Sequence, residues 1–481
     1  MADRRIEEKY TAVTAPWRPR LALLVAATFF MEFLDGTVLV TAIPSIAGDF
    51  RVAAADVNIT MTAYLMTVAM GIPISGWLAD RVGARRLFCA AIAAFTAASL
   101  LCALSQDLTM LTLSRILQGA GGAMMVPVGT LVVLRATPKE ELLRATAYLV
   151  WPGLLAPVLA PLVGGALTSY LSWHWIFLIN LPLGLAAFLA ALRLVPGGIG
   201  DRNRRLDWLG LALTTSGVGA FVVGLELAGG HPSGPWPWAV VAAGLILLAA
   251  AAAWMRRSRQ PLFDLGVFHT RTFRATSTGG FIYRLTISAV PFLLPLMLQD
   301  GFGWDPLHAG AMVATVFVGN IGIKPATTPL IRRFGFKPVL VFASLASAVT
   351  FALCSLLDAS TPEALIFGLL LASGAFRSIG FSAYASVQYA DISPAQLPSA
   401  NALSATLVQL ATGAGIAIAA LFLRVFQTSG TLGAAPTAPY RGAFLIMAAL
   451  MLLSTLDSLL LHRHAGAEVS QARRTGEQPS G

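Results

Sequence analysis

Fourteen long apolar stretches constrain the fold of this chain more than any other feature of its sequence. Each is long enough for a helix to cross the hydrocarbon core of a bilayer, which is about 30 Å thick. A helix satisfies its own backbone hydrogen bonds inside hydrocarbon, so these stretches predict transmembrane α-helices. The predicted spans cover residues 21–43, 57–79, 87–105, 108–134, 142–169, 173–195, 206–229, 237–255, 274–299, 307–330, 338–357, 362–389, 398–427 and 440–461.

The composition supports a polytopic membrane protein. Of the 481 residues, 56% are hydrophobic and only 12% are charged, whereas soluble domains average about 25% charged residues. Cys89, Cys102 and Cys354 all lie in apolar stretches without a metal-binding spacing. We therefore interpret the cysteines as small core residues and expect neither disulfides nor a metal site.

The distribution of positive charge predicts the orientation in the membrane. With the amino terminus inside, 26 of the 33 lysines and arginines fall on the cytosolic side, three fall outside and four fall within spans. This positive-inside bias predicts a multi-pass protein of the inner, cytoplasmic membrane with both termini in the cytosol. The net charge of +10 then reflects insertion and contact with anionic lipids, and we expect no nucleic-acid partner.

The spans divide the chain into halves. The segment 80–85 after the second span matches 332–337 after the tenth, a weak internal repeat of the kind found in secondary transporters. The expected parts are a cytosolic tail (1–20), an N-terminal six-helix bundle (21–195), linkers with two inserted helices (196–273), a C-terminal six-helix bundle (274–461) and a cytosolic tail expected to be disordered (462–481).

Glu32 and Asp35 place two carboxyl groups in the middle of the first span. An ionised acid there costs about 2.5–3.5 kcal/mol on insertion scales, and residues three apart share one helix face. We interpret the pair as proton carriers, with Arg115 in the fourth span as the nearby cation, since burial raises a carboxyl pKa and a cation lowers it. The alternatives are a static ion pair and, for Glu32, an ordinary hydrogen-bonded polar residue.

Five motifs in chain order resemble those of the major facilitator superfamily and its fourteen-span drug:proton antiporter branch. They are the first-span motif Leu34–Val38 with Ala42 and Pro44, the loop Gly76–Arg86, the span-four motif with Arg115, Gln118 and Gly119, the antiporter motif with Pro157, Pro161, Gly164 and Gly165, and Ser172–Pro182. Val40 and Ala160 stand where the branch usually carries asparagine and glycine.

The resemblance implies an all-α membrane protein with two six-helix bundles and two extra transmembrane helices inserted between them. It implies multidrug efflux by alternating access, and it associates Arg115 with proton coupling. We expect a monomer that uses protons as the coupling ion and no other cofactor, with a small molecule as its substrate. The runner-up function is proton-coupled export or import of a specific metabolite or organic anion.

The loop after the second span is interpreted as a gate latch. Asp80 lies at the carboxyl end of that helix, where a negative charge is unfavourable. The amino terminus of span thirteen, near Pro398, is the predicted docking partner when the cytosolic side is closed. The other latch residues are Gly76, Arg81, Gly83, Arg85 and Arg86. The alternative is a basic loop that serves only membrane topology.

In span five, Pro157, Pro161, Gly164 and Gly165 predict a rigid and tightly packed seam, because proline bends a helix and glycine permits close approach. Ordinary membrane packing is the alternative. The candidates for lining a substrate cavity are Phe29, Phe33, Gln118, Tyr283, Arg284 and Arg377.

The two arginines among these candidates suggest an anionic or zwitterionic substrate, or pairing with Glu32 and Asp35. Lys324, near the end of its span, can instead extend to the interface.

Other classes of protein fit the sequence poorly. The six histidines all fall in loops or at span ends, and no nucleophile–base set or phosphate-binding loop is present, so we do not expect an enzyme. A membrane sensor or scaffold would need a sizeable soluble domain, and the connections between the spans are too short to supply one.

Overall fold

The computed structural model describes all residues except 1–17, 199, 202–203, 230–233, 430–434, 463–464 and 467–481. At positions 54, 55, 154, 157, 158, 161, 306 and 307 only the backbone is described. Most of the predicted amino-terminal tail (1–20) and most of the predicted carboxyl-terminal tail (462–481) therefore lie outside the described residues.

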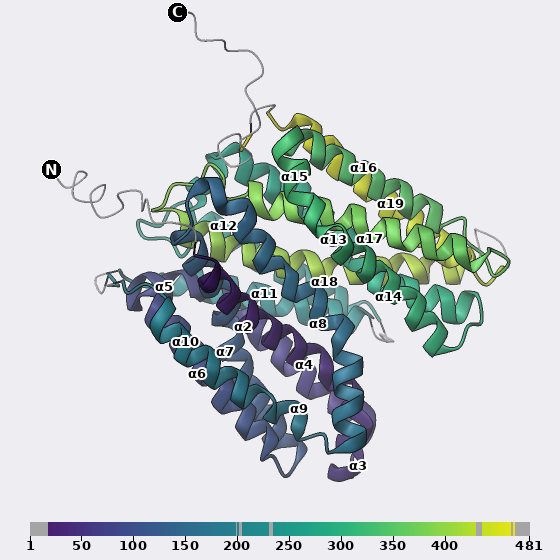
Figure 1. Ribbon diagram of the computed structural model, residues 1–481, viewed down its shortest axis with the longest axis horizontal. Helices are drawn as coiled ribbons and strands as arrows, with labels where there is room; N and C mark the ends of the chain where they lie inside the picture. Colours follow the sequence, from purple (N-terminus) through teal and green to yellow (C-terminus); the bar gives the residue numbers. More distant parts are fainter. Residues whose placement is uncertain are drawn as a thin grey trace, which may run out of the picture. The chain divides into compact units, whose positions relative to one another are not determined.

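Regular structure in the described part of the chain is entirely helical (Figure 1). Short 3-10 segments and one π-helical turn, Met297–Gly301, interrupt or extend the α-helices. The α-helices are α2 (Pro19–Val38), α3 (Ile43–Phe50), α4 (Ala54–Gly71), α5 (Ser75–Val82), α6 (Ala84–Ala103), α7 (Leu108–Arg135), α8 (Leu142–Tyr170), α9 (Trp175–Leu178), α10 (Asn180–Leu194), α11 (Trp208–Gly229), α12 (Trp236–Met255), α13 (Arg271–Leu296), α14 (Pro306–Gly322), α15 (Lys324–Phe334), α16 (Phe336–Cys354), α17 (Glu363–Val387), α18 (Leu397–Ser429) and α19 (Ala438–Leu460).

Every predicted apolar window coincides with helical structure. Among the described residues, twelve helices are long and apolar enough to cross a membrane. The pair His308–Gly322 and Lys324–Phe334, bent by 47°, is a thirteenth candidate. The remaining window, 142–169, is occupied by α8. The prediction of an all-α membrane protein is therefore confirmed.

Two glycines connect helices at equivalent places in the internal repeat. Gly83 separates α5 from α6 with φ of 96°, and Gly335 separates α15 from α16 with φ of 81°. A positive φ is accessible to glycine without the steric cost that a side chain imposes. The two halves of the sequence thus connect the second and third helices of the repeat through a glycine with positive φ.

The chain forms two compact units. Unit 1 comprises Met1–Thr137, Tyr148–Val267 and Ser393–Leu410, and unit 2 comprises Pro138–Ala147, Phe268–Ile392 and Ala411–Gly481. In unit 1, α7 packs against α4, α6 and α2, and α10 packs against α6 and α2 (Figure 1). The inserted helices α11 and α12 form an antiparallel hairpin, and α11 contacts α4.

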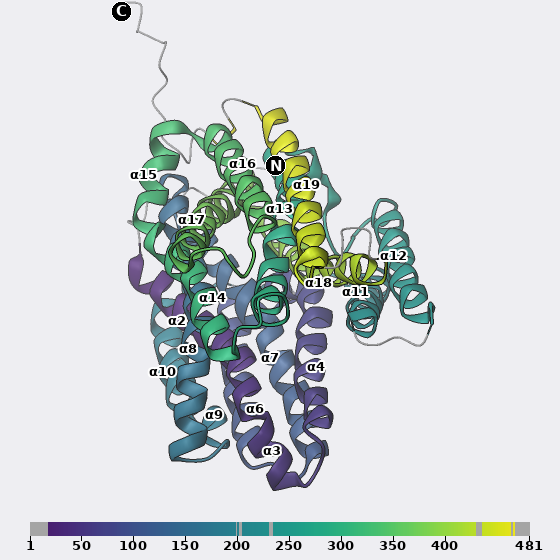
Figure 2. The ribbon, with the colours of Figure 1, turned by 90° about the vertical axis from the view of Figure 1, so that its right-hand side faces the viewer.

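In unit 2, α17 lies between α14 and α16, and α19 contacts α16 and α13 (Figure 2). Reciprocal glycines bring α14 and α17 together. A Cβ atom added to Gly374 would collide with the carbonyl oxygen of Val316, and one added to Gly319 would collide with that of Leu371. Small residues permit this close approach. The resulting van der Waals contact holds the helices together in lipid, where the hydrophobic effect does not drive their association.

Replacing Gly374 with alanine is expected to destabilise the protein by about 1–3 kcal/mol, because the added methyl group forces the two backbones apart. Gly368 is a matched control on the same helix, since an added Cβ there meets open space. Thermal unfolding of both variants in detergent micelles measures the difference. Equal stability of the two variants would contradict the packing.

Candidate functional site

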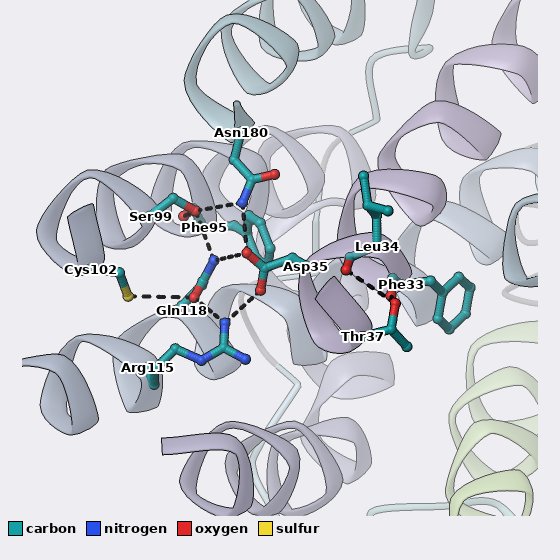
Figure 3. Close-up of polar contacts among 10 residues, drawn as sticks. All are labelled: Phe33, Leu34, Asp35, Thr37, Phe95, Ser99, Cys102, Arg115, Gln118 and Asn180. Atoms are coloured by element: carbon teal, nitrogen blue, oxygen red, sulfur yellow. Dashed lines mark hydrogen bonds and ion pairs between the residues drawn. The ribbon is translucent and has the colours of Figure 1, made fainter. Parts of the chain in front are cut away.

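A fully buried ion pair joins α2 to α7 in unit 1. Nη1 of Arg115 lies 2.5 Å from Oδ2 of Asp35, and both side chains are 0% exposed. Figure 3 shows that the carboxylate projects from α2 toward the guanidinium and away from Phe33 and Thr37. Two of the three residues predicted to couple protons are therefore in direct contact.

Amide and hydroxyl groups complete the surroundings of the Asp35 carboxylate (Figure 3). Gln118, one turn after Arg115, donates from Nε2 to Oδ1 of Asp35 at 2.9 Å and to the hydroxyl of Ser99 on α6 at 2.8 Å. Asn180 on α10 donates to the same Oδ1 at 2.7 Å. Both oxygens of Asp35 thus accept hydrogen bonds, and the network ties α2, α6, α7 and α10 together.

The arginine has further partners beside the carboxylate. Its Nη1 also donates to Oε1 of Gln118 at 2.6 Å, and its guanidinium carbon lies 4.0 Å from the ring centroid of Tyr64 on α4. The Phe177 ring is 5.8 Å away. Nε and Nη2 of Arg115 have no hydrogen-bond partner among the described residues. The positive charge is held by one carboxylate and by aromatic faces.

Glu32 lies one turn before Asp35 on the same helix and is 6% exposed. Within the described part of the chain, its Oε2 is buried without a hydrogen-bond partner. A Cβ atom at Gly122 would lie 3.3 Å from Oε1 of Glu32 and 3.3 Å from the Tyr64 hydroxyl. The absent side chain of Gly122 therefore leaves room for Glu32 beside Tyr64, and both acids face the interior of unit 1.

The buried Asp35–Arg115 pair and the nearby Glu32 carboxyl group are not explained by a contribution to folding stability. Taking two charges out of water costs several kcal/mol per ion, and apolar replacements of buried pairs are often neutral or stabilising. An unpartnered buried carboxyl oxygen adds a further cost. Buried titratable groups in such settings are candidates for function.

Sequence reasoning missed three members of this network: Tyr64, Ser99 and Asn180. Each is a polar residue inside an apolar span, but such residues commonly bond to their own helix. The signal available for Asn180 was its position in the Ser172–Pro182 motif. The hydroxyl of Ser99 does bond to its own helix, at the carbonyl of Phe95, 2.9 Å away.

A second charged cluster surrounds Asp80 at the end of α5. Its Oδ1 accepts a hydrogen bond from Arg135 of α7 at 2.9 Å, and its Oδ2 accepts one from Arg204 in the linker before α11. The partners are thus two arginines and not the amino terminus of α18 that the sequence predicted. Partial burial lowers the pKa of the Arg204 guanidinium, and the negative charge of Asp264 partly offsets this shift. Arginine nevertheless stays charged at physiological pH.

The other predicted latch residues lie around this cluster. A Cβ atom at Gly76 would lie 2.9 Å from the carbonyl oxygen of Pro398, so α5 packs closely on the start of α18. Gly83 adopts its positive φ against the carbonyl of Gly198. Arg81 donates to the carbonyl of Arg204 at 2.8 Å, Arg85 donates to that of Leu192, and Arg86 is exposed.

The antiporter motif is only partly described. The side chains of Pro157 and Pro161 lie outside the described atoms, although the backbone of α8 is helical through both positions. A Cβ atom at Gly164 would collide with the hydroxyl of Thr41, whereas one at Gly165 meets open space. Gly164 alone therefore permits a close approach, to the segment that follows α2.

The predicted cavity residues have different environments. Phe29 is buried and Phe33 is 37% exposed, and their rings pack edge to face at 6.5 Å. Tyr283 is fully buried in unit 2 and donates to the carbonyl of Arg377 at 3.0 Å. Arg284 and Arg377 are also buried there. Asp35 has Arg115 as its ion-pair partner within unit 1.

Comparison with known proteins decides the family. The family model of the major facilitator superfamily matches residues 25–203 and 276–479. The chain belongs to the major facilitator superfamily. The buried ion pair and the Asp80 cluster therefore lie in a multi-pass membrane transporter, and the resemblance predicted from the five motifs is confirmed.

Relatives of this superfamily transporter include proteins named multidrug resistance protein MdtD. The relative from Pectobacterium atrosepticum is 38% identical over 407 residues, which cover 84% of this chain and 87% of the relative. The relative from Shigella flexneri is 39% identical and covers 84% and 86%. The crystal structure of the human organic anion transporter MFSD10 has a TM-score of 0.66 at 16% identity, covering 92% of this chain and all of that one. This last similarity supports the fold.

Proposed function

We propose that this transporter exports small amphipathic compounds in exchange for entering protons, by alternating access. The single observation that carries the proposal is the buried Asp35–Arg115 pair with Glu32 one turn away. The names of the multidrug resistance relatives support efflux as the direction and amphipathic compounds as the substrates.

The geometry suggests how a proton changes the site. Protonation of Asp35 removes the charge that Arg115 contacts at 2.5 Å. The guanidinium then depends on Gln118 and the Tyr64 ring, so the contact between α2 and α7 weakens. Loss of the proton restores the pair. Uptake and release of a proton by Asp35 thereby change the strength of the contact between α2 and α7.

The available energy is sufficient for uphill export. Each proton that enters down a potential of 100 mV supplies about 2.3 kcal/mol, and a pH gradient adds to this. Two acids permit up to two protons per cycle. We propose that the protein works as a monomer in the cytoplasmic membrane with both termini in the cytosol, and that it needs no cofactor besides the proton.

Transport by everted membrane vesicles tests the proposal. Their interior corresponds to the outside of the cell, so an inside-acid gradient should drive uptake of a lipophilic fluorescent cation such as rhodamine 6G. Collapse of the gradient with a protonophore should stop this uptake. Movement of a substrate in the same direction as protons would contradict antiport and support the alternative, a proton-coupled metabolite importer.

We propose that Asp80 stabilises one conformation of the cytosolic side through Arg135 and Arg204. Replacing Asp80 with asparagine removes the charge shared by both arginines, so we expect turnover to fall about tenfold while the KM changes less than twofold. Glu141→Gln is the control, since it removes a more exposed pair with Arg144 at 3.4 Å. Vesicle transport rates at several substrate concentrations check this, and a turnover equal to that of the control would exclude the role.

A further inference from the structure

The two inserted helices of unit 1 carry a cavity at one end of their hairpin. α11 begins at Trp208, α12 ends at Met255, and the two helices lie side by side (Figure 2). Because they run antiparallel, the start of α11 and the end of α12 share one end of the hairpin. A cavity of about 480 Å³ lies there. The polar network around Asp35 includes no residue of either helix, so the cavity calls for a separate explanation.

A buried carboxylate holds the walls of this cavity together. Oδ1 of Asp207 accepts hydrogen bonds from the amide of Gly210 at 2.9 Å and from the indole nitrogen of Trp254 at 2.8 Å. Its Oδ2 accepts one from the amide of Leu262 at 3.2 Å. Asp207 thus caps α11 and ties it to the end of α12 and to the segment that follows. Because three donors compensate its charge, Asp207 shapes the cavity without repelling an anion as a free carboxylate would.

Two arginines give the cavity a positive lining. Arg205 comes from the segment before α11, and Arg259 comes from the segment after α12. Both are exposed, and neither forms an ion pair or a side-chain hydrogen bond with another described residue. Ser258 and Gln260 add a hydroxyl and an amide to the same lining. The planar fork of arginine matches the oxygens of a phosphate group, so the polar side of the cavity suits a phosphate-bearing anion.

The rest of the lining is apolar. Leu206, Trp208, Leu209 and Trp254 contribute to it, and Trp208 is 74% exposed and Leu209 47% exposed. These residues stand at the ends of two helices that are long and apolar enough to cross a membrane. Tryptophan is enriched at this level, where its ring lies among the lipid headgroups. The cavity therefore presents cations beside apolar surface, which complements an amphipathic anion.

We propose that this cavity binds an anionic phospholipid, with Arg205 and Arg259 on the phosphate group and Trp208 and Leu209 against the acyl chains. The positive-inside distribution predicts that this end of the hairpin faces the cytosol, and the cytosolic leaflet carries anionic lipids. A soluble phosphate ester shares the headgroup chemistry, but it offers nothing to the exposed apolar lining. The proposal gives the inserted hairpin a lipid-binding role and does not depend on proton-coupled export.

Native mass spectrometry of the purified full-length protein, released from detergent micelles, tests the site. The probes are dioleoyl phosphatidylglycerol, dioleoyl phosphatidylcholine and glycerol 3-phosphate. Phosphatidylglycerol should bind saturably and about tenfold more tightly than phosphatidylcholine, whose choline group cancels the phosphate charge, and glycerol 3-phosphate at the same concentration should not displace it. Equal affinity for the two lipids would overturn the proposal. Displacement by glycerol 3-phosphate would also overturn it and would assign the cavity to a soluble phosphate ester.

Variants of the two arginines identify the place of binding. Arg205→Gln and Arg259→Gln should each weaken the affinity for phosphatidylglycerol about fivefold, and the double variant about 25-fold, because each arginine beside an anionic lipid contributes separately. Arg193→Gln is the matched control, since Arg193 is an exposed arginine in the last turn of α10 and does not line the cavity. The ligand-free Tm of all variants should equal that of the wild type, because these exposed side chains make no ion pair. Wild-type affinity in the double variant would overturn the assignment.

Replacing Trp208 with serine tests the apolar lining at unchanged charge. The affinity for dioleoyl phosphatidylglycerol should fall about tenfold, since the exposed indole loses its contact with the acyl chains. The preference for phosphatidylglycerol over phosphatidylcholine should persist, because both arginines remain. An affinity equal to that of the wild type would contradict the acyl-chain contact and with it the choice of a lipid as the occupant.

Discussion

Replacing Asp35 with asparagine is expected to reduce gradient-driven transport at least 100-fold while leaving gradient-independent substrate exchange at a measurable rate. Asparagine preserves the size of the side chain, and its carbonyl oxygen can still accept hydrogen bonds from Gln118 and Asn180, while its amide group no longer accepts one from Arg115. It cannot gain or lose a proton. The substitution therefore removes titration while it disturbs packing as little as possible.

The matched control is Asp107→Asn. Asp107 is an exposed residue that caps the amino terminus of α7 by accepting a hydrogen bond from the amide of Met110 at 2.8 Å, and asparagine caps helices equally well. Counterflow and gradient-driven uptake in proteoliposomes separate the two activities. Gradient-driven uptake by Asp35→Asn at the rate of Asp107→Asn would exclude Asp35 as a proton carrier.

Replacing Arg115 with methionine is expected to destabilise the protein by about 3–5 kcal/mol, because it leaves the Asp35 carboxylate buried and unpaired. The double variant Asp35→Leu/Arg115→Met should recover at least half of this loss, since both charges are then absent. Gln118, Ser99 and Asn180 keep some unsatisfied polar groups in the double variant, so full recovery is not expected.

Denaturant or thermal unfolding in detergent of the two single variants and the double variant gives the coupling energy of the pair. Arg144→Met is the control, because Arg144 is 52% exposed and its pair with Glu141 is worth at most about 1 kcal/mol. A loss for Arg115→Met no larger than that of the control would show that the buried pair does not form as described.

The sequence predicted the helical fold well because the length of an apolar window determines whether a helix can cross a bilayer. It also predicted the Asp35–Arg115 contact, since the N-terminal half offers one arginine away from the ends of its spans and two acids within a span. In hydrocarbon, a charged side chain has few other groups with which it can pair. Local composition therefore limits the pairing strongly.

The partners of Asp80 could not be predicted in the same way. The cytosolic side was expected to hold 26 positive residues. Long flexible side chains near water can form many alternative ion pairs of nearly equal free energy. Arg204 is 124 positions away from Asp80 in sequence, so only the path of the linker brings it close. The bend between α14 and α15 was also missed, because Gly322 and Pro325 fell in a window interpreted as one span.

Proton movement that accompanies substrate transport tests the central claim most directly. Full-length protein in liposomes loaded with a pH-sensitive dye, given a substrate gradient and no imposed proton gradient, should move protons against the direction of the substrate. The double variant Glu32→Gln/Asp35→Asn should still exchange substrate but should move no protons. Proton movement by this variant at the wild-type rate would contradict the account.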